Sequence, residues 1–290
     1  MAEEKIDRSG RRGFLEKSGK GLLGAGLLAS ATATSPAAPP KDVPAKVGTA
    51  NEWVPCNGYP AIPYPCPVEP TFGKCRTFFL EHLRKGGHFD AKDFSVRVPA
   101  LAELHQQAFE VFDALDLTPE QAALARQFDF GPATLQFEHF VREYLYIPYG
   151  FSPPRVARIQ VYLNAAMADG FTVTWDLKYQ HMLPRPVQLR PELRTLVQTP
   201  GHPTWPSGHS TVAGAADAIL SYFFPAQQKL IHDFAENCAY ARQLGGVHYP
   251  ADDNDGLTIG RVIGNIAAQR AASDGYDDLA GLRQRPPASI

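Results

Sequence analysis

The stretch Pro206-Ser207-Gly208-His209 is flanked by two other short motifs, and the three together decide how this chain is interpreted. Lys178-x6-Arg185-Pro186 precedes it and Arg242-x5-His248-x3-Asp252 follows it, so that 75 residues gather lysine, arginine, serine, histidine and aspartate. Arginine offers forked donors, lysine a point charge, and serine and backbone N–H groups offer neutral donors. A histidine can also bond the central atom of an oxyanion covalently. This inventory predicts a site for an oxyanion such as phosphate or vanadate.

The central motif lies at the predicted start of a helix. A helix N-terminus presents free N–H groups and the positive end of its dipole to an anion. Gly208 would allow the backbone to approach that anion closely. Ser207 could equally be a plain N-cap, but this alone does not account for the Gly208 and His209 that follow it. We therefore favour a functional role for this motif.

The first motif supplies two cations from different local elements. Lys178 lies at the predicted end of a long helix, and Arg185 follows a break at Pro184. The two side chains can therefore converge on one point. Taken alone, both could be ordinary solvated surface charges.

The third motif carries a histidine with an acidic residue close behind it. Gly245-Gly246 would end the preceding helix and turn His248 inward. Asp252 could then hold one ring nitrogen and leave the other free to attack phosphorus or vanadium. Asp253 and Asp255 are alternatives for that partner.

Helical periodicity dominates from about residue 100 onward, and period-2 strand patterns are almost absent. Thr118-Pro119-Glu120-Gln121 indicates an N-cap, a proline at the first helical position and a capping-box glutamine. We therefore expect an all-α helical bundle. Besides the helix that begins at this cap, the predicted helices cover residues 101–115, 133–146, 152–179, 209–224, 227–247 and 255–272.

Composition excludes some classes of protein. Of the 290 residues, 44% are hydrophobic, enough for a buried core, and the net charge of −2 argues against nucleic-acid binding. We find no run of 18 uncharged apolar residues and so expect no transmembrane segment. Cys56, Cys66 and Cys75 could form a disulfide after export, which the sequence leaves open, and Cys238 is expected to be a buried small hydrophobe.

The N-terminus resembles a signal peptide for protein export. Gly10 to Lys17 contains Arg11-Arg12 and is similar to a twin-arginine export signal, followed by an apolar segment and Ala-x-Ala cleavage sites. A disordered basic N-terminus is the alternative. We expect export by the twin-arginine machinery to the periplasm or cell exterior. The expected organisation is a signal peptide at 1–33, a Pro-rich, Cys-containing lead at 34–75, a single helical domain at 76–275 and a flexible tail at 276–290.

The three motifs, in this order, resemble the signature that joins vanadium-dependent haloperoxidases with type-2 phosphatidic acid phosphatases and bacterial acid phosphatases. The resemblance covers roughly residues 150–270 and implies a helical bundle with the oxyanion site in its core. It implies that His248 is the apical vanadium ligand or the phosphate nucleophile, and that His209 is the acid–base group. The residues it implies for oxyanion binding are Lys178, Arg185, Ser207, Gly208 and Arg242. The third motif of that family usually opens Ser-Arg, whereas this chain has Ala241-Arg242.

Within this superfamily, two features favour the haloperoxidases. Residues 165–185 look like soluble haloperoxidase relatives, and His202, five residues before Ser207, resembles a bromoperoxidase feature that phosphatases mostly lack. His202 is thus a candidate for the halide site, although it could be a loop histidine without a role. We expect a vanadate-dependent oxidation of bromide or iodide by hydrogen peroxide. The alternatives are a secreted acid phosphatase, which needs no cofactor and cleaves phosphomonoesters through a phosphohistidine, and an anion-binding protein without turnover.

Overall fold

The computed structural model describes residues 68–276, and all their regular structure is helical apart from one isolated bridge between Lys85 and His88. The all-α prediction is thereby confirmed. Short helical turns come first, and longer helices follow. They are η1 (Phe72–Lys74), η2 (Glu81–Leu83), η3 (Ala91–Phe94), α2 (Leu101–Gln107), η4 (Ala114–Asp116), α3 (Pro119–Gln127), α4 (Ala133–Val141), the π-helical η5 (Arg142–Tyr146), α5 (Ile147–Tyr149), α6 (Pro153–His181), α7 (Pro186–Leu189), α8 (Gly208–Phe223), η6 (Pro225–Gln227), α9 (Gln228–Leu244) and α10 (Pro250–Ala272).

Local signals set most of these boundaries. The Thr118 hydroxyl accepts from the Gln121 amide and the Gln121 side chain reaches back, which is the predicted capping box of α3. Pro153 and Pro154 open α6 after Ser152, where the missing N–H groups of proline cost nothing. Pro225 follows directly on the end of α8.

Two predicted helices have wrong boundaries. The helix expected over 101–115 ends at Gln107, and Phe109 on its supposed apolar face is 71% exposed. The last helix starts at Pro250 rather than at residue 255, because Pro250 at the first position and Asp252, whose side chain accepts from the Tyr249 amide, provide its N-terminus. This correction places Asp252 in the first helical turn.

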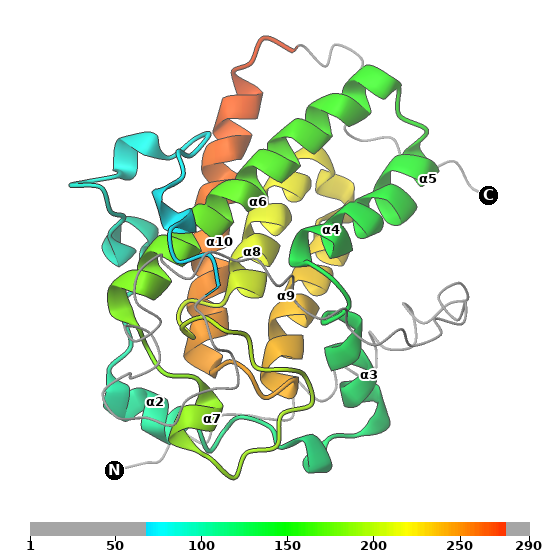
Figure 1. Cartoon of the computed structure of the whole chain (residues 1–290). Coiled ribbons are helices and arrows are strands. Elements are labelled where there is room, and N and C mark those ends of the chain that lie inside the picture. The colour runs from blue at the N-terminus through cyan, green and yellow to red at the C-terminus, as the bar shows by residue number, and fades with distance from the viewer. Residues whose placement is uncertain (1–67, 277–290) are drawn as a thin grey trace, which may run out of the picture. The chain divides into compact units, whose positions relative to one another are not determined.

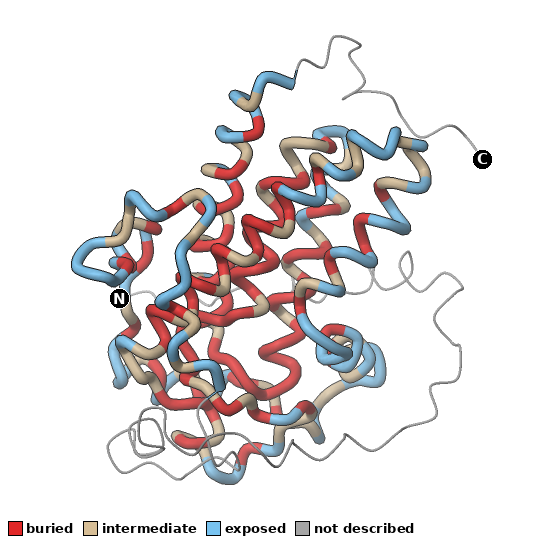
Figure 2. Tube along the Cα trace, turned by 45° about the horizontal axis from the view of Figure 1, so that its top comes forward, coloured by how far each residue is buried: buried red, intermediate tan, exposed pale blue. Residues whose placement is uncertain are grey.

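Helix α8 is the centre of the bundle, with α6, α9 and α10 packed around it (Figure 1). The tube coloured by burial is red along these four helices where they face one another (Figure 2). Small residues allow the closest approach, between α8 and α10. A Cβ added at Gly260 would lie 2.1 Å from the Thr211 carbonyl oxygen, so only glycine fits there.

The helices alternate in direction, and this alternation brings the motifs together. The C-terminal ends of α6 and α9 and the N-terminal ends of α8 and α10 lie at the same end of the bundle, the lower end in Figure 1. That end therefore collects Lys178, the Ser207 cap, Arg242 and His248.

Several expectations fall on residues that the structure does not describe. The twin-arginine segment, the cleavage sites, Cys56, Cys66 and the tail beyond Tyr276 lie outside residues 68–276. The predicted lead segment at 34–75 includes η1, which packs against α6. Cys75 is an exposed free thiol, and Cys238 is buried, as expected. Within residues 68–276, no helix combines the length and the apolar character that crossing a membrane requires.

Candidate active site

His248 occupies the turn between α9 and α10 and is 2% exposed. Its Nδ1 lies 2.8 Å from Oδ2 of Asp252, and its Nε2 lies 3.1 Å from Nη1 of Arg185. A guanidinium only donates, so Nε2 must accept, and Nδ1 must carry the proton that goes to Asp252. Of the three carboxylates that could have held His248, the structure selects Asp252. The ring therefore presents the lone pair of Nε2 to the cations of the site.

Electrostatics keep this imidazole neutral. Burial and then the charges of Arg185, Lys178 and Arg242 hold the pKa of His248 well below its ordinary value. Burial also raises the pKa of Asp252 to about 6, against the hydrogen bond that it accepts from Thr204. An uncharged ring with a free lone pair is the form that can act as a nucleophile or as a ligand.

Two of the three motif cations are held by backbone carbonyl groups. Lys178 Nζ donates to the carbonyl oxygens of Pro203 and Thr204, each at 2.6 Å. Arg185 Nη1 donates to the Val247 carbonyl oxygen at 2.7 Å. Burial is the first cause that lowers both pKa values, that of Lys178 well below its usual range and that of Arg185 to about 9. Both cations are fully buried, which rejects the reading of solvated surface charge.

Arg242 reaches the site from the C-terminal end of α9. Its Nη1 donates to Asp129 Oδ1 at 3.2 Å, and this half-exposed carboxylate belongs to the segment after α3. Its Nε is buried and has no hydrogen-bond partner among residues 68–276. A buried donor without an acceptor is costly, and an anion in the site would satisfy it.

Ser207 is the N-cap of α8, as its position in the sequence allowed, because its hydroxyl accepts from the Ser210 amide. The Ser207 amide donates to the Asp252 carbonyl oxygen at 3.0 Å. A Cβ added at Gly208 would lie 3.3 Å from the Trp175 ring. Packing against that ring is thus a second reason for glycine here, besides the close approach of an anion that the sequence indicated.

His209 lies in the first turn of α8, half-buried. Its Nε2 is buried without a partner among residues 68–276, so Nδ1 makes its hydrogen bond to the backbone of Phe128. Burial, followed by the charge of Arg242, holds the pKa of His209 well below its ordinary value. Burial is thus the main cause of this lowered pKa, and the nearby cations add to it.

His202 joins the same cluster. Its Nδ1 lies 3.0 Å from Arg185 Nη2, and its ring packs on Trp175 with centroids 4.7 Å apart. Burial and the charges of Lys178 and Arg185 lower its pKa well below the usual value. The structure thus brings every predicted site residue to one end of the bundle.

Sequence reasoning missed four residues that contact the site. The Thr204 hydroxyl donates to Asp252, and the Ser210 hydroxyl lies within hydrogen-bond distance of the Ser207 hydroxyl. Asp129, from the segment after α3, accepts from Arg242, and the Trp175 ring packs against Gly208. Only Trp175 carried a signal, since it lies one helical turn before Lys178. Residues 68–276 contain no cluster of three His, Cys, Asp or Glu side chains placed to hold a metal ion.

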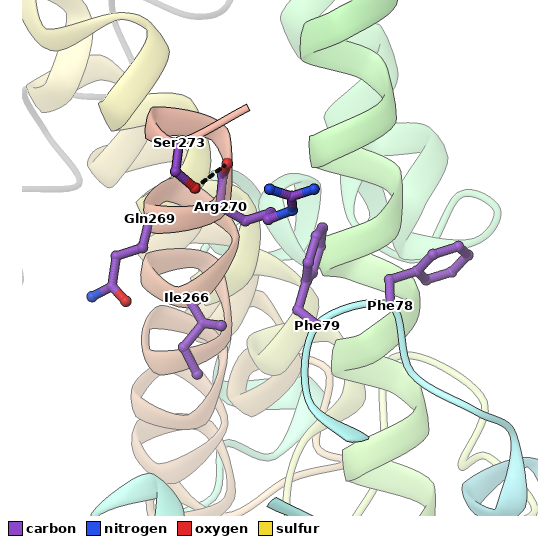
Figure 3. Close-up of a pocket in the computed structure, with 6 residues that line it drawn as sticks. All are labelled: Phe78, Phe79, Ile266, Gln269, Arg270 and Ser273. Carbon is purple, nitrogen blue, oxygen red and sulfur yellow. Dashed lines mark hydrogen bonds between the residues drawn. The ribbon is translucent and has the colours of Figure 1, made fainter. Parts of the chain in front are cut away.

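An open hollow of about 380 Å³ lies elsewhere, between the segment before η2 and the C-terminal part of α10 (Figure 3). From Asp252 to Ile266, α10 rises by roughly 20 Å, so this hollow is remote from His248. Its lining residues are Phe78, Phe79, Ile266, Gln269, Arg270 and Ser273.

Comparison with known proteins agrees with this geometry. Residues 159–273 match the sequence profile described as the PAP2 superfamily, a segment that contains all three motifs. This segment is therefore similar to the PAP2 superfamily. A search of curated proteins found no match.

Solved structures similar to this chain include three of bacterial vanadium-dependent haloperoxidases. An iodoperoxidase shares 23% identity at a TM-score of 0.58, over 70% of this chain and 57% of that protein. A chloroperoxidase in its holo form shares 14% identity at a TM-score of 0.51, over 71% and 55%. A chloroperoxidase in its apo form shares 15% identity at 0.57, over 71% and 56%. This chain thus has their fold and spans less than two thirds of their length.

Proposed function

We propose that this protein is a vanadate-dependent haloperoxidase that oxidises bromide or iodide with hydrogen peroxide. The observation that carries the proposal is the buried, neutral His248, whose Nε2 lone pair faces Arg185 in a cluster of three cations. The fold shared with haloperoxidases and the position of His202 beside Arg185 support this choice within the superfamily.

The residues present fit vanadate. Arg242 Nε and His209 Nε2 are buried polar atoms without partners among residues 68–276, and Lys178 and Arg185 add two buried positive charges. Such a cluster is repulsive by itself, and a bound oxyanion relieves it. His248 would hold the metal, and Lys178, Arg185, Arg242, Ser207 and the Gly208 amide would hold its oxygens.

Bound vanadate would supply the Lewis acid that activates peroxide towards two-electron oxidation of a halide. The chain's own part is to bind, orient and move protons. Asp252 fixes the ring of His248 through Nδ1, so that Nε2 keeps its direction. His209 Nε2 is free to take a proton from a reactant and return it. In this proposal His202, whose Nδ1 lies 3.0 Å from Arg185 Nη2, would contact the halide.

A second candidate function uses the same side chains without a cofactor. The match to the PAP2 superfamily favours an acid phosphatase. In that reaction His248 Nε2 attacks phosphorus, and the ester oxygen leaves with a proton that His209 has taken up together with the substrate. Neutral His209 then takes a proton from the water that hydrolyses the phosphohistidine. The cations would stabilise the charge on the phosphoryl oxygens.

A paired assay separates the two functions. One preparation, freed of vanadate, is tested for hydrolysis of phosphomonoesters, and the same preparation with added vanadate and peroxide is tested for oxidation of bromide and iodide. We expect halide oxidation that requires both additions. Brisk ester hydrolysis without any halide oxidation would replace the haloperoxidase proposal by the phosphatase.

A further inference from the structure

A buried carboxylate that the proposed chemistry does not use lies next to the oxyanion site. Asp253 is 0% exposed and is the neighbour of Asp252 in the first turn of α10. Its Oδ1 lies 2.7 Å from the Ser210 hydroxyl, and that hydroxyl lies 2.9 Å from the Ser207 hydroxyl. Oδ2 of Asp253 is buried without a hydrogen-bond partner among residues 68–276. Three side chains thus form a line that ends at a proposed anion-binding hydroxyl.

The proton on Asp253 decides which way the two hydroxyls donate. An ionised Asp253 only accepts, so Ser210 donates to it, and the Ser210 oxygen is then free to accept from Ser207. The Ser207 hydrogen points away from the anion in that arrangement. If Ser207 donated to the anion instead, two oxygens 2.9 Å apart would face each other without a hydrogen between them.

Protonation of Asp253 reverses the direction in which the hydroxyl groups of this line donate their hydrogen bonds. Its O–H donates to the Ser210 oxygen, Ser210 donates to the Ser207 oxygen, and Ser207 donates to the anion. All three hydroxyl groups then have an acceptor, and the carboxyl no longer adds a negative charge beside the anion.

We propose that Asp253, acting through the Ser210 hydroxyl, sets the direction in which Ser207 donates, and that an oxyanion binds at Ser207 together with a proton on this line of side chains. Asp253 is then a positioning residue. The inference rests on the proposed oxyanion site and deepens it.

The surroundings of Asp253 support uptake of a proton near neutral pH. Burial raises its pKa to about 7, and the charge of Asp252 adds to this, whereas the side chains of Ser210, Ser207 and Gln243 oppose it. The other groups that interact with it electrostatically are Lys178 from α6, Arg185 before α7 and Cys238 from α9. An anion bound nearby would raise the pKa of Asp253 further.

Sulfate is a suitable probe, because it is a tetrahedral oxyanion that does not titrate between pH 6 and 8.5. Its affinity for the full chain is measured by calorimetry across that range, which lies below the pKa of about 9 of Arg185. One linked proton makes the affinity fall by about tenfold for each pH unit above the pKa of the linked group. We expect the wild-type affinity to fall above pH 7 more steeply, by about this factor, than that of Asp253→Asn.

Asp253→Asn is informative because its uncharged amide can donate to Ser210 at every pH and so imitates the protonated acid. At pH 8.5 it should bind sulfate at least about tenfold more tightly than the wild type, by the same linkage. Asp255→Asn is the matched control: Asp255 accepts from Trp205 Nε1 at 2.8 Å, outside the line, and its variant should keep the wild-type pH slope.

Ser210→Ala separates the hydroxyl line from the charge of Asp253 and should flatten the slope. If Ser210→Ala keeps the wild-type slope, Asp253 acts through its charge alone and the inference is wrong. An unchanged slope in Asp253→Asn, or a flattened one in Asp255→Asn, would overturn it as well. If the folded wild type binds neither sulfate nor vanadate at any pH, the oxyanion site itself fails, and the inference with it.

Discussion

His248 and its neighbours explain why this site suits an anion. The ring is neutral because burial and the charges of Arg185, Lys178 and Arg242 oppose its protonation. Asp252, 2.8 Å away, accepts from the remaining N–H, so the lone pair of Nε2 has one direction. A neutral nitrogen among buried cations attracts an electron-deficient centre that carries negatively charged oxygens, which describes both vanadate and phosphate.

Arg242 provides the first prediction at the residue scale. Arg242→Lys keeps the charge but loses the fork of N–H donors, including the unpartnered Nε. We expect oxyanion affinity to fall by about 1–3 kcal/mol, the usual value of a charge-assisted hydrogen bond. Arg158→Lys, which alters an arginine paired with Asp274, is the control and should bind as the wild type does. Unchanged vanadate affinity in Arg242→Lys would remove this arginine from the binding shell.

His209 provides the second prediction at the residue scale. Its Nε2 has no partner among residues 68–276 and its pKa lies well below the usual value, so it is a neutral base at neutral pH. His209→Ala should keep most of the oxyanion affinity and lose about 10²–10⁴-fold in turnover, the usual contribution of a general acid–base. Binding is followed by calorimetry and turnover by halide oxidation. Equal losses in affinity and turnover would make His209 a binding residue instead.

The sequence predicted the identity of the site residues better than their surroundings. Motif spacing was sufficient to select Lys178, Arg185 and His248, and the choice of Asp252 over Asp253 required coordinates. Asp129 and Thr204 were not predicted as site residues, because a carboxylate in a loop and a threonine before a tryptophan form no recognisable sequence pattern. Only the fold brings them to Arg242 and Asp252.

At the scale of elements, the contact of α8 with α10 supports the site, since these two helices present their N-termini to it. A Cβ at Gly260 would lie 2.1 Å from the Thr211 carbonyl oxygen, whereas one at Gly170 of α6 would lie 3.4 Å from the Thr211 methyl group. The first distance is a clash and the second an ordinary contact.

Two glycine substitutions that approach the same threonine therefore form a matched pair. Gly260→Ala must separate the two helices and should lower the free energy of unfolding by about 1–3 kcal/mol or more, as overpacking does. Gly170→Ala should be neutral or stabilise by up to about 1 kcal/mol through helix propensity. Urea unfolding of both variants measures the difference. Equal stability would mean that the two helices can move apart freely.

Helix positions were predictable where caps and apolar stripes agree, as in α3, α6 and α8. They were wrong where one of these signals was overlooked. The apolar residues after Gln107 follow a helical spacing, but Phe109 faces solvent, because the chain turns away at that point. Pro250 and Asp252 mark the true start of α10, and the functional interpretation of Asp252 had hidden its second role as a capping residue.

At the scale of the whole molecule, the route of the chain out of the cytoplasm remains a prediction from residues outside the described range. Arg11-Arg12 followed by an apolar segment and Ala-x-Ala sites motivates it. Replacing both arginines by lysine should keep the precursor in the cytoplasm, whereas the wild type should be processed near residues 32–34. Cell fractionation with N-terminal sequencing gives the answer. Normal export of the double variant would exclude the twin-arginine route.

We expect the segment that is similar to the PAP2 superfamily to work through His248, whichever of the two reactions it catalyses. The most direct measurement is the activity of His248→Ala, compared with wild type and with the exposed control His82→Ala, in both the halide and the phosphoester assay. We expect His248→Ala to be inactive in both assays while it remains folded by circular dichroism, because one nitrogen is both the apical ligand and the nucleophile. Retention of most of the wild-type activity in the folded His248→Ala variant would contradict the account.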